Sequence, residues 1–249
     1  MINQDEKRIT YDLKKFTIRD ITECGRAMRR MGDGVAGMEE AAGRIVRHLY
    51  ENMIYGQNGD RACSLVRFFK THPYEKLTDE LKKYALINFG GGIPLPETKC
   101  LTLLGTVGEN QDWNRRSTSK GHQAILLPSE EVVHKIPMML NVIKQLGLNV
   151  SSVVKPDPAL LLDMEQKTYS VFLVPEALGS PYIPAQEGFV VPYGIKSVMG
   201  FGGILPSGDL FVIIMFLKTA VSRETADLFK NLSLNVKLAI LPFETRVFS

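Results

Sequence analysis

The sequence is poor in tryptophan and cysteine, and it contains no long apolar run. Its one tryptophan is Trp113, and its three cysteines, Cys24, Cys63 and Cys100, form no Cys-x-x-Cys pair. An odd set of spaced thiols is typical of a reducing compartment, which predicts a cytoplasmic protein. The most apolar stretch, residues 210–217, is far shorter than the ~20 residues of a membrane-spanning helix, so no membrane partner is expected. Residues 1–7 lack an apolar segment, and we therefore expect no secretory signal.

The charge of the chain is also small for its length. Lys and Arg number 30 against 27 Asp and Glu, a formal net charge of +3 over 249 residues. Nucleic-acid-binding domains concentrate Lys and Arg on one face, and this balance predicts no nucleic-acid partner. Hydrophobic residues make up 45% of the chain and charged residues 23%, which is typical of a globular domain with a full core.

Two helices are expected at the start of the chain. Thr17 and Asp20 form a capping-box pattern that predicts a helix beginning after Thr17. Residues 32–34, Gly-Asp-Gly, end that helix, and the spacing of apolar residues predicts a second one over 38–53. The apolar stripe of the first helix consists of Ile18, Ile21, Cys24, Gly25, Met28 and Met31.

The rest of the chain alternates strand-like and helix-like segments. Residues 210–217 are apolar at both odd and even positions, which predicts a central strand. Helices are expected over 129–147, with a kink at Pro137, and over 222–241 after the cap Ser222. Hairpin-connected strands with helices gathered at the chain ends predict an α+β fold rather than a doubly wound parallel sheet. The other predicted strands are 62–69, 100–107, 123–127, 169–174 and one or two within 188–205.

Two segments resemble GAF domains. Residues 43–77, from Gly-Arg-Ile-Val-Arg-His-Leu-Tyr to Ala-Cys-Ser-Leu-Val-Arg-Phe-Phe, are similar to the opening helix and first strand of that family. Residues 189–241 are similar to its closing half, with Ile-Lys-Ser-Val at 195–198 and the hairpin Gly-Asp-Leu-Phe-Val-Ile-Ile at 208–214. The resemblance implies a GAF/PAS-like central antiparallel sheet flanked by helices. It divides the chain into an N-terminal helical arm, 1–33, and a GAF-like domain, 34–249, with an enlarged middle at 78–168.

The same resemblance implies a function in sensing. The chain looks like the input segments that precede kinase or diguanylate-cyclase output domains in bacterial two-component sensors, so a non-catalytic signalling module is expected. Neither the distributed Asn-Lys-Phe-Asp-Glu signature of cyclic-nucleotide-binding members nor the cysteine context that attaches a phytochrome chromophore is present. The resemblance therefore implies a ligand pocket or a dimerisation role and leaves the ligand, or any cofactor, unnamed.

Two non-helical segments carry the candidate ligand-binding residues. The polar loop 109–122 holds Trp113 with several cationic side chains, which suits a lid over an anionic ligand. The Pro-punctuated connector 175–193 is aromatic-rich, which suits a pocket wall. We expect the two segments to face one another around a small anionic or aromatic ligand; the alternatives are a solvated surface loop and plain packing. The candidates are Trp113, Arg115, Arg116, His122, Tyr182, Phe189 and Tyr193.

Cysteine chemistry is the alternative function. Some GAF-fold enzymes reduce free methionine sulfoxide with a low-pKa thiolate, and Cys63 and Cys100 lie in predicted strands of one sheet. Their apolar neighbours would raise the thiol pKa, which disfavours a nucleophile and favours a packing role. No metal site is expected either, because the histidines His48, His72, His122 and His134 share no His-x-x-x-His spacing.

The terminal helices predict self-association. An isolated helix of this length is marginal in water, so the apolar stripe of the first helix must be buried. The second and last helices each suffice to cover one side of the sheet, which leaves the first helix without an obvious intramolecular partner. We therefore expect a homodimer through the terminal helices, with folding of the arm onto its own domain as the alternative.

Overall fold

The computed structural model describes residues 9–248. The expectation of no secretory signal concerns residues 1–7 and lies outside the described residues. The helices are α1 Ile18–Arg29, α2 Met38–Asn52, α3 Asp79–Phe89, α4 Glu130–His134, α5 Pro137–Gln145, α6 Val150–Val154, α7 Leu161–Gln166, α8 Arg223–Leu228 and α9 Lys230–Ile240. The strands are β1 Tyr11–Asp12, β2 Met53–Tyr55, β3 Asp60–Arg61, β4 Cys63–Pro73, β5 Lys99–Gly108, β6 Ala124–Leu127, β7 Phe172–Val174, β8 Ser197–Ile204 and β9 Leu210–Leu217. Short 3₁₀ turns and one π-helical turn, Gln186–Val190, connect them.

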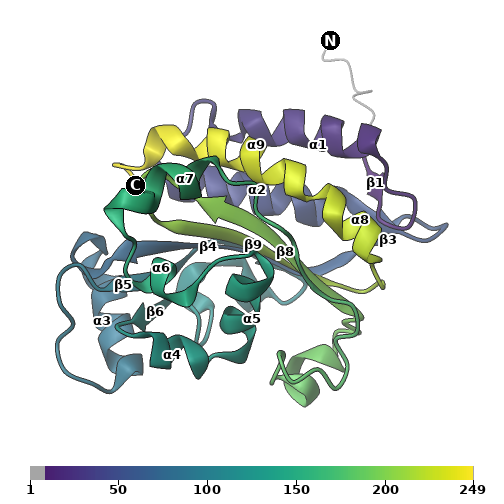
Figure 1. The fold of residues 1–249 in the computed structure, drawn as a ribbon. Helices are drawn as coiled ribbons and strands as arrows, with labels where there is room; N and C mark the ends of the chain where they lie inside the picture. Colours follow the sequence, from purple (N-terminus) through teal and green to yellow (C-terminus); the bar gives the residue numbers. More distant parts are fainter. Residues whose placement is uncertain (1–8, 249) are drawn as a thin grey trace, which may run out of the picture.

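Within residues 9–248 the main sheet has six strands in the order β6-β5-β4-β9-β8-β7, and all of its neighbours are antiparallel. A small second sheet, β1-β2-β3, lies at the start of the chain. Helices cover both faces of the main sheet (Figure 1). The predicted α+β class and the central antiparallel sheet are therefore confirmed, as is the central position of residues 210–217.

The two faces of the sheet carry separate apolar clusters. Along β9, Phe211, Ile213, Met215 and Leu217 pack with α1, α2 and α9 on one face. The alternate residues of the same strand, 210, 212, 214 and 216, pack on the other face with α5, α6 and the connector 175–193. A strand that is buried on both sides needs apolar residues at every position, which explains the unbroken apolar run.

Helix α1 lies beside α9 at the edge of the molecule (Figure 1), and this corrects the premise of the dimer prediction. Thr17 caps α1 as predicted, with the reciprocal Asp20 bond of a capping box. The buried residues Ile21, Cys24 and Met28 belong to the same apolar cluster as α2 and α9. The assumption that the first helix lacks an intramolecular partner is therefore wrong. Ile18, assigned to the buried stripe, is 73% exposed instead.

Several element boundaries also differ from expectation. The predicted helix 129–147 is two helices, α4 and α5, because Pro137 begins the second one instead of kinking a single one. The last helix breaks at Phe229 between α8 and α9. Residues 188–205 contain a single strand, β8, after the π-helical turn, and helix α3 was not predicted. In the described part, no helix combines the length and the apolarity that crossing a bilayer requires.

Candidate ligand-binding site

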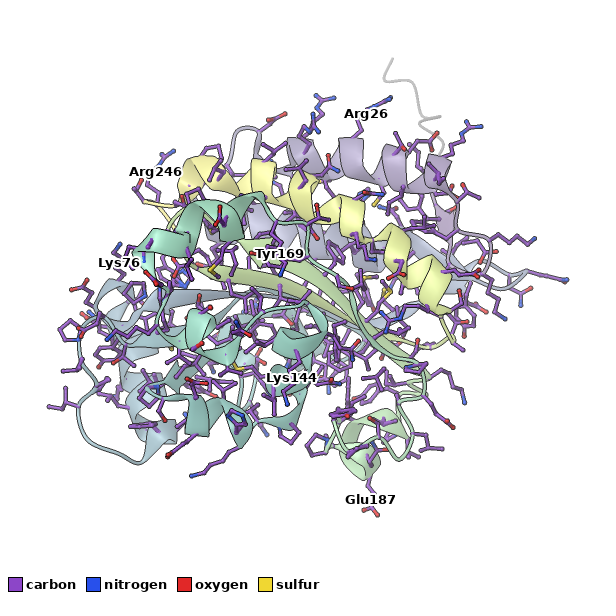
Figure 2. All side chains as sticks on the ribbon, viewed as in Figure 1. Arg26, Lys76, Lys144, Tyr169, Glu187 and Arg246 are labelled. Carbon is purple, nitrogen blue, oxygen red and sulfur yellow. The ribbon has the colours of Figure 1, made fainter. Side chains whose placement is uncertain are left out.

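The loop 109–122 and the connector 175–193 meet on the sheet face that carries α4, α5 and α6. The ring of Trp113 lies 4.4 Å from that of Tyr193 and 5.3 Å from that of Phe189, measured between centroids. Asn110 Nδ2 donates a hydrogen bond of 3.2 Å to the Tyr193 hydroxyl. The two segments therefore face one another as the sequence predicts. Glu187, at the outer tip of the connector, projects outward from the molecule (Figure 2).

Hydrogen bonds to the backbone of the loop hold Trp113 in place. Trp113 lies in the 3₁₀ turn Gln111–Asn114, which the Asn110 side chain caps by accepting a hydrogen bond from the backbone of Asp112. The Thr106 hydroxyl of β5 donates a hydrogen bond of 2.7 Å to the carbonyl of Trp113. At Gly108 a Cβ atom would lie 2.8 Å from the indole ring, so glycine is needed there for the ring to approach the end of β5.

Beneath this contact the structure contains two neighbouring cavities. The outer cavity has a volume of about 480 Å³, and the inner one about 120 Å³. Arg67, His122, Met138 and Phe216 line both, so they form the wall that the cavities share. The outer cavity is further lined by Leu65, Asn110, Asp112, Trp113, Thr118, Lys120, Ile183, Pro184, Ala185, Gly188 and Phe189.

The inner cavity lies between the sheet and helix α5. Its wall is aliphatic and aromatic apart from Arg67 and His122. The residues that line only this cavity are Phe69, Leu101, Ile125, Ile136, Met139, Val142, Ile143, Leu210, Val212 and Ile214.

Arg67 is the charged group in the wall that the two cavities share. It lies on β4 between Thr106 of β5 and Ile214 of β9, and it is only 8% exposed. Its Nη2 donates a hydrogen bond of 3.0 Å to the Ser119 hydroxyl, while its Nε is buried without a hydrogen-bond partner. Among the described residues, no carboxylate forms an ion pair with it. Burial lowers the pKa of Arg67 to about 10, which still leaves the side chain charged at neutral pH.

His122 lies beside Arg67 at the rim of the site. Its Nδ1 is 2.9 Å from the carbonyl oxygen of Lys120. Partial desolvation and, next, the charge of Arg67 lower the pKa of His122, so the imidazole is neutral at neutral pH. A neutral imidazole serves as a hydrogen-bond donor or acceptor without adding a second charge.

The structure does not bring all seven predicted site residues together. Trp113, His122 and Phe189 line the outer cavity, and Tyr193 packs on Trp113. Tyr182 is 42% exposed and lies outside both cavities.

The two arginines were assigned to the wrong face. Arg116 forms an ion pair with Glu39 of α2 at 2.5 Å and donates a hydrogen bond to the Leu103 carbonyl. Arg115 lines a separate hollow with Arg44 of α2. Their prediction as ligands of this cavity is therefore wrong.

Cys63 and Cys100 are not arranged as a redox pair. All three are free thiols and fully buried. Cys63 lies at the start of β4 and Cys100 at the start of β5, and because these strands are antiparallel the two thiols are at opposite ends of the pair. Burial raises the pKa of both thiols, which disfavours the thiolate that sulfoxide reduction needs. The thiol-dependent alternative is therefore unsupported. Within residues 9–248, no three His, Cys, Asp or Glu side chains gather in a metal-binding group.

Sequence reasoning missed the central residue of the site. Arg67 interrupts the apolar run Leu-Val-Arg-Phe-Phe of the predicted strand 62–69, and a charged residue flanked in this way is rarely buried unless it is paired. This charged residue within an apolar strand was the feature of the sequence that could have indicated the site. The contribution of Met138 and Met139 had no comparable signal, because methionines on a helix are typical of ordinary core packing.

Comparison with solved structures finds similarity to GAF domains. One is the GAF domain from a phosphoenolpyruvate-protein phosphotransferase of Coxiella burnetii, with 11% identity, a TM-score of 0.43, and coverage of 92% of this chain and 96% of that one. Another is the phycoerythrobilin-bound GAF domain from a cyanobacterial phytochrome, with 9% identity, a TM-score of 0.37, and coverage of 91% and 98%. A bacteriophytochrome from R. palustris matches at 9% identity and a TM-score of 0.42, over 93% of this chain and 39% of its own.

The similarity to GAF domains agrees with the resemblance drawn from the sequence. Identities of 9–11% and TM-scores below 0.5 are too low to transfer a ligand or a partner to this chain. No model of a protein family matches the chain, and no curated protein does.

Proposed function

We propose that this chain is a regulatory sensory module, without catalytic activity of its own, that binds a small anionic ligand beside Arg67. The observation that carries the proposal is the buried guanidinium in the cavity wall, with one neutral hydrogen bond and no carboxylate partner among the described residues. Taking a charge out of water costs several kcal/mol unless a counter-charge compensates it. An anion in the cavity supplies that compensation.

The surroundings of Arg67 suit a bound ligand better than a structural ion pair. Ser119 and His122 add neutral hydrogen-bonding groups beside the cation, and Lys120 adds a second cation on the outer side. Asp112 also lines the outer cavity, and its carboxylate disfavours an anion there. The anion is therefore best placed on the inner side of Arg67.

The output of the module belongs to the same proposal. A ligand on Arg67 would contact His122 of the loop 109–122 and so change the contact of that loop with the connector 175–193, and a kinase or cyclase partner would detect that change. The three buried free thiols support a cytoplasmic setting for this signalling.

The fluorescence of Trp113 gives a direct test. It is the one tryptophan of the chain and it lines the outer cavity, which shares Arg67 and His122 with the inner one, so we expect a ligand on Arg67 to change its emission. We expect benzoate, hexanoate or a similar monoanion to change that emission saturably. Arg67→Met should weaken binding roughly 10- to 100-fold, the range for a hydrogen bond to a charged group. Arg115→Met is the matched control, because it removes an exposed arginine of the same loop region outside the cavity, and it should leave binding unchanged.

If Arg67→Met and Arg115→Met weakened binding by the same factor, the attraction would be non-specific, and the result would contradict the proposed site. Absence of any binding, checked by calorimetry with each monoanion, would contradict the proposal as a whole. Thermal unfolding of the two variants establishes that a change in binding does not come from a change in folding.

Self-association through the terminal helices stays a prediction with a changed interface. The inner side of α1 is occupied by α9, so a second copy would meet the outer surfaces, where Ile18, Leu234 and Leu238 are exposed. Figure 2 shows Arg26 projecting outward from α1 on this side. We expect light scattering at tens of micromolar to give the mass of a dimer, and Leu234→Glu with Leu238→Glu to give a monomer. A monomeric parent chain would contradict it.

A further inference from the structure

We infer that the ligand is an aliphatic monocarboxylate of about four to seven carbons, with its carboxylate on Arg67 and its chain in the inner cavity. This inference rests on the proposed function and names the ligand class for the same site. It follows from three properties of the inner cavity: the polarity of its wall, its volume and the charge that it presents.

The polarity of the wall excludes ligands with many polar groups. Apart from Arg67 and His122, every residue that lines the inner cavity is aliphatic, aromatic or methionine. A sugar, a nucleotide or a polyol would bury hydroxyl or base groups against this surface without hydrogen-bond partners, and each unpaired group would weaken binding about 5- to 150-fold. A hydrocarbon chain with one polar end fits this wall, because the chain contacts the apolar residues and the polar end contacts Arg67 and His122.

The volume limits the length of that chain. The inner cavity measures about 120 Å³, somewhat less than the ~150 Å³ engineered cavity that binds benzene. A chain of about four to seven carbons, counting the carboxylate, fits that space when the carboxylate itself lies at Arg67. Met138 and Met139 of α5 are flexible side chains that adjust to an aliphatic chain of varying shape.

The charge at the head of the cavity matches a single carboxylate. Arg67 is the one guanidinium of the inner wall, and His122 is neutral at neutral pH because burial and Arg67 lower its pKa. One positive charge balances one carboxylate, and the planar guanidinium suits its geometry. A phosphate dianion would remain half compensated at this site, with oxygens that the Ser119 hydroxyl and His122 do not suffice to satisfy.

A chain-length series tests the inference. Binding of straight-chain carboxylates from acetate to decanoate is measured by Trp113 fluorescence and by calorimetry on the full chain. We expect affinity to rise about fourfold per added methylene, the factor that corresponds to burying one CH₂ group. The rise should stop near heptanoate, when the inner cavity is full, and decanoate should bind no better.

Two variants test the contributions of the carboxylate and of the hydrocarbon chain to binding separately. Arg67→Met should weaken hexanoate at least tenfold and leave 1-hexanol unchanged, because the alcohol does not need the cation. Met139→Ala enlarges the inner cavity, and it should move the best chain length upward by about two carbons without changing the effect of Arg67→Met. Thermal unfolding of both variants checks that they fold.

The outcomes distinguish this inference from the proposed function. If the protein bound benzoate or phosphate but none of the straight-chain carboxylates, the inferred ligand class would be wrong. The proposed anion-sensing function would then still hold. Equal binding of hexanoate and 1-hexanol would overturn the role of Arg67 in holding the head group. Absence of binding by every probe would remove the proposed function and this inference together.

Discussion

Asp209→Asn should destabilise the protein by about 3–5 kcal/mol, the range for breaking a buried ion pair. Asp209 is 4% exposed and receives Lys70 Nζ at 2.7 Å and Lys99 Nζ at 2.5 Å. The Ser207 hydroxyl donates a third hydrogen bond to it at 3.0 Å. Burial alone would raise the pKa of Asp209, but the two ammonium groups outweigh burial and hold that pKa below its usual value. The asparagine would leave two cations in the interior without their counter-charge.

The charges of Lys70, Lys99 and Asp209 also determine the expected cost of substituting a lysine. Lys70 and Lys99 are buried against the single carboxylate of Asp209, so these three groups carry one excess positive charge. Burial lowers the pKa of Lys70, and the attraction of Asp209 opposes that effect. Lys70→Met removes the excess charge and leaves the Lys99–Asp209 pair, so we expect it to cost far less than Asp209→Asn.

Urea denaturation at pH 7 measures these differences in the free energy of unfolding. The double variant Asp209→Asn with Lys70→Met should recover part of the loss, because it removes one of the two unpaired cations. A cost below about 1 kcal/mol for Asp209→Asn would contradict the cluster as described, since that is the value of an exposed pair. Additivity of the two single changes would contradict their coupling.

The sequence predicted the sheet better than it predicted the site. The reason is that strands and helix caps depend on residues close together in the chain, whereas the site depends on residues that are far apart in it. The capping box at Thr17 and the apolar run of 210–217 depend on residues near one another in the chain, so local pattern suffices to recognise them. Helix α3 escaped notice because it buries little, with Leu81 and Ala85 as its buried residues. Its amphipathic pattern is correspondingly weak.

The site depends on contacts that local pattern does not encode. The sequence placed Trp113 and Arg116 in one loop, but it did not indicate that the tryptophan turns toward the connector while the arginine turns toward Glu39 of α2. The position of α1 against α9 likewise depends on residues such as Asn235, which lies against Gly25 from a distant part of the chain. Burial of Arg67 was recognisable from its apolar flanks, but its missing partner was not.

The histidine His72 should make the protein lose stability as the pH falls. Its side chain is 1% exposed, its Nε2 has no hydrogen-bond partner, and its ring stacks on Phe248 with centroids 5.3 Å apart. Burial and, next, the charge of Lys70 lower the pKa of His72 to about 3. Lys99 and Lys76 act in the same direction, and Asp209 acts against them.

The direction of the effect follows from which state binds the proton. Between about pH 6.5, the usual value of a histidine, and about pH 3, the unfolded chain binds a proton at His72 that the folded chain does not. The free energy of unfolding therefore rises with pH in this window and is lost as the pH falls through it. The loss from this residue should reach about 2–4 kcal/mol by pH 4, and it should stop growing below about pH 3.

Urea denaturation of the parent chain, His72→Gln and His134→Gln between pH 7 and pH 4 separates this contribution from others. We expect His72→Gln to flatten the pH dependence, and His134→Gln to leave it unchanged because that histidine is exposed on α4. Some slope should remain in His72→Gln, since burial also lowers the pKa of His48. An unchanged slope in His72→Gln would mean that His72 accepts a proton in the folded state, which requires water or a counter-charge at its Nε2 and contradicts the sealed environment beneath Phe248.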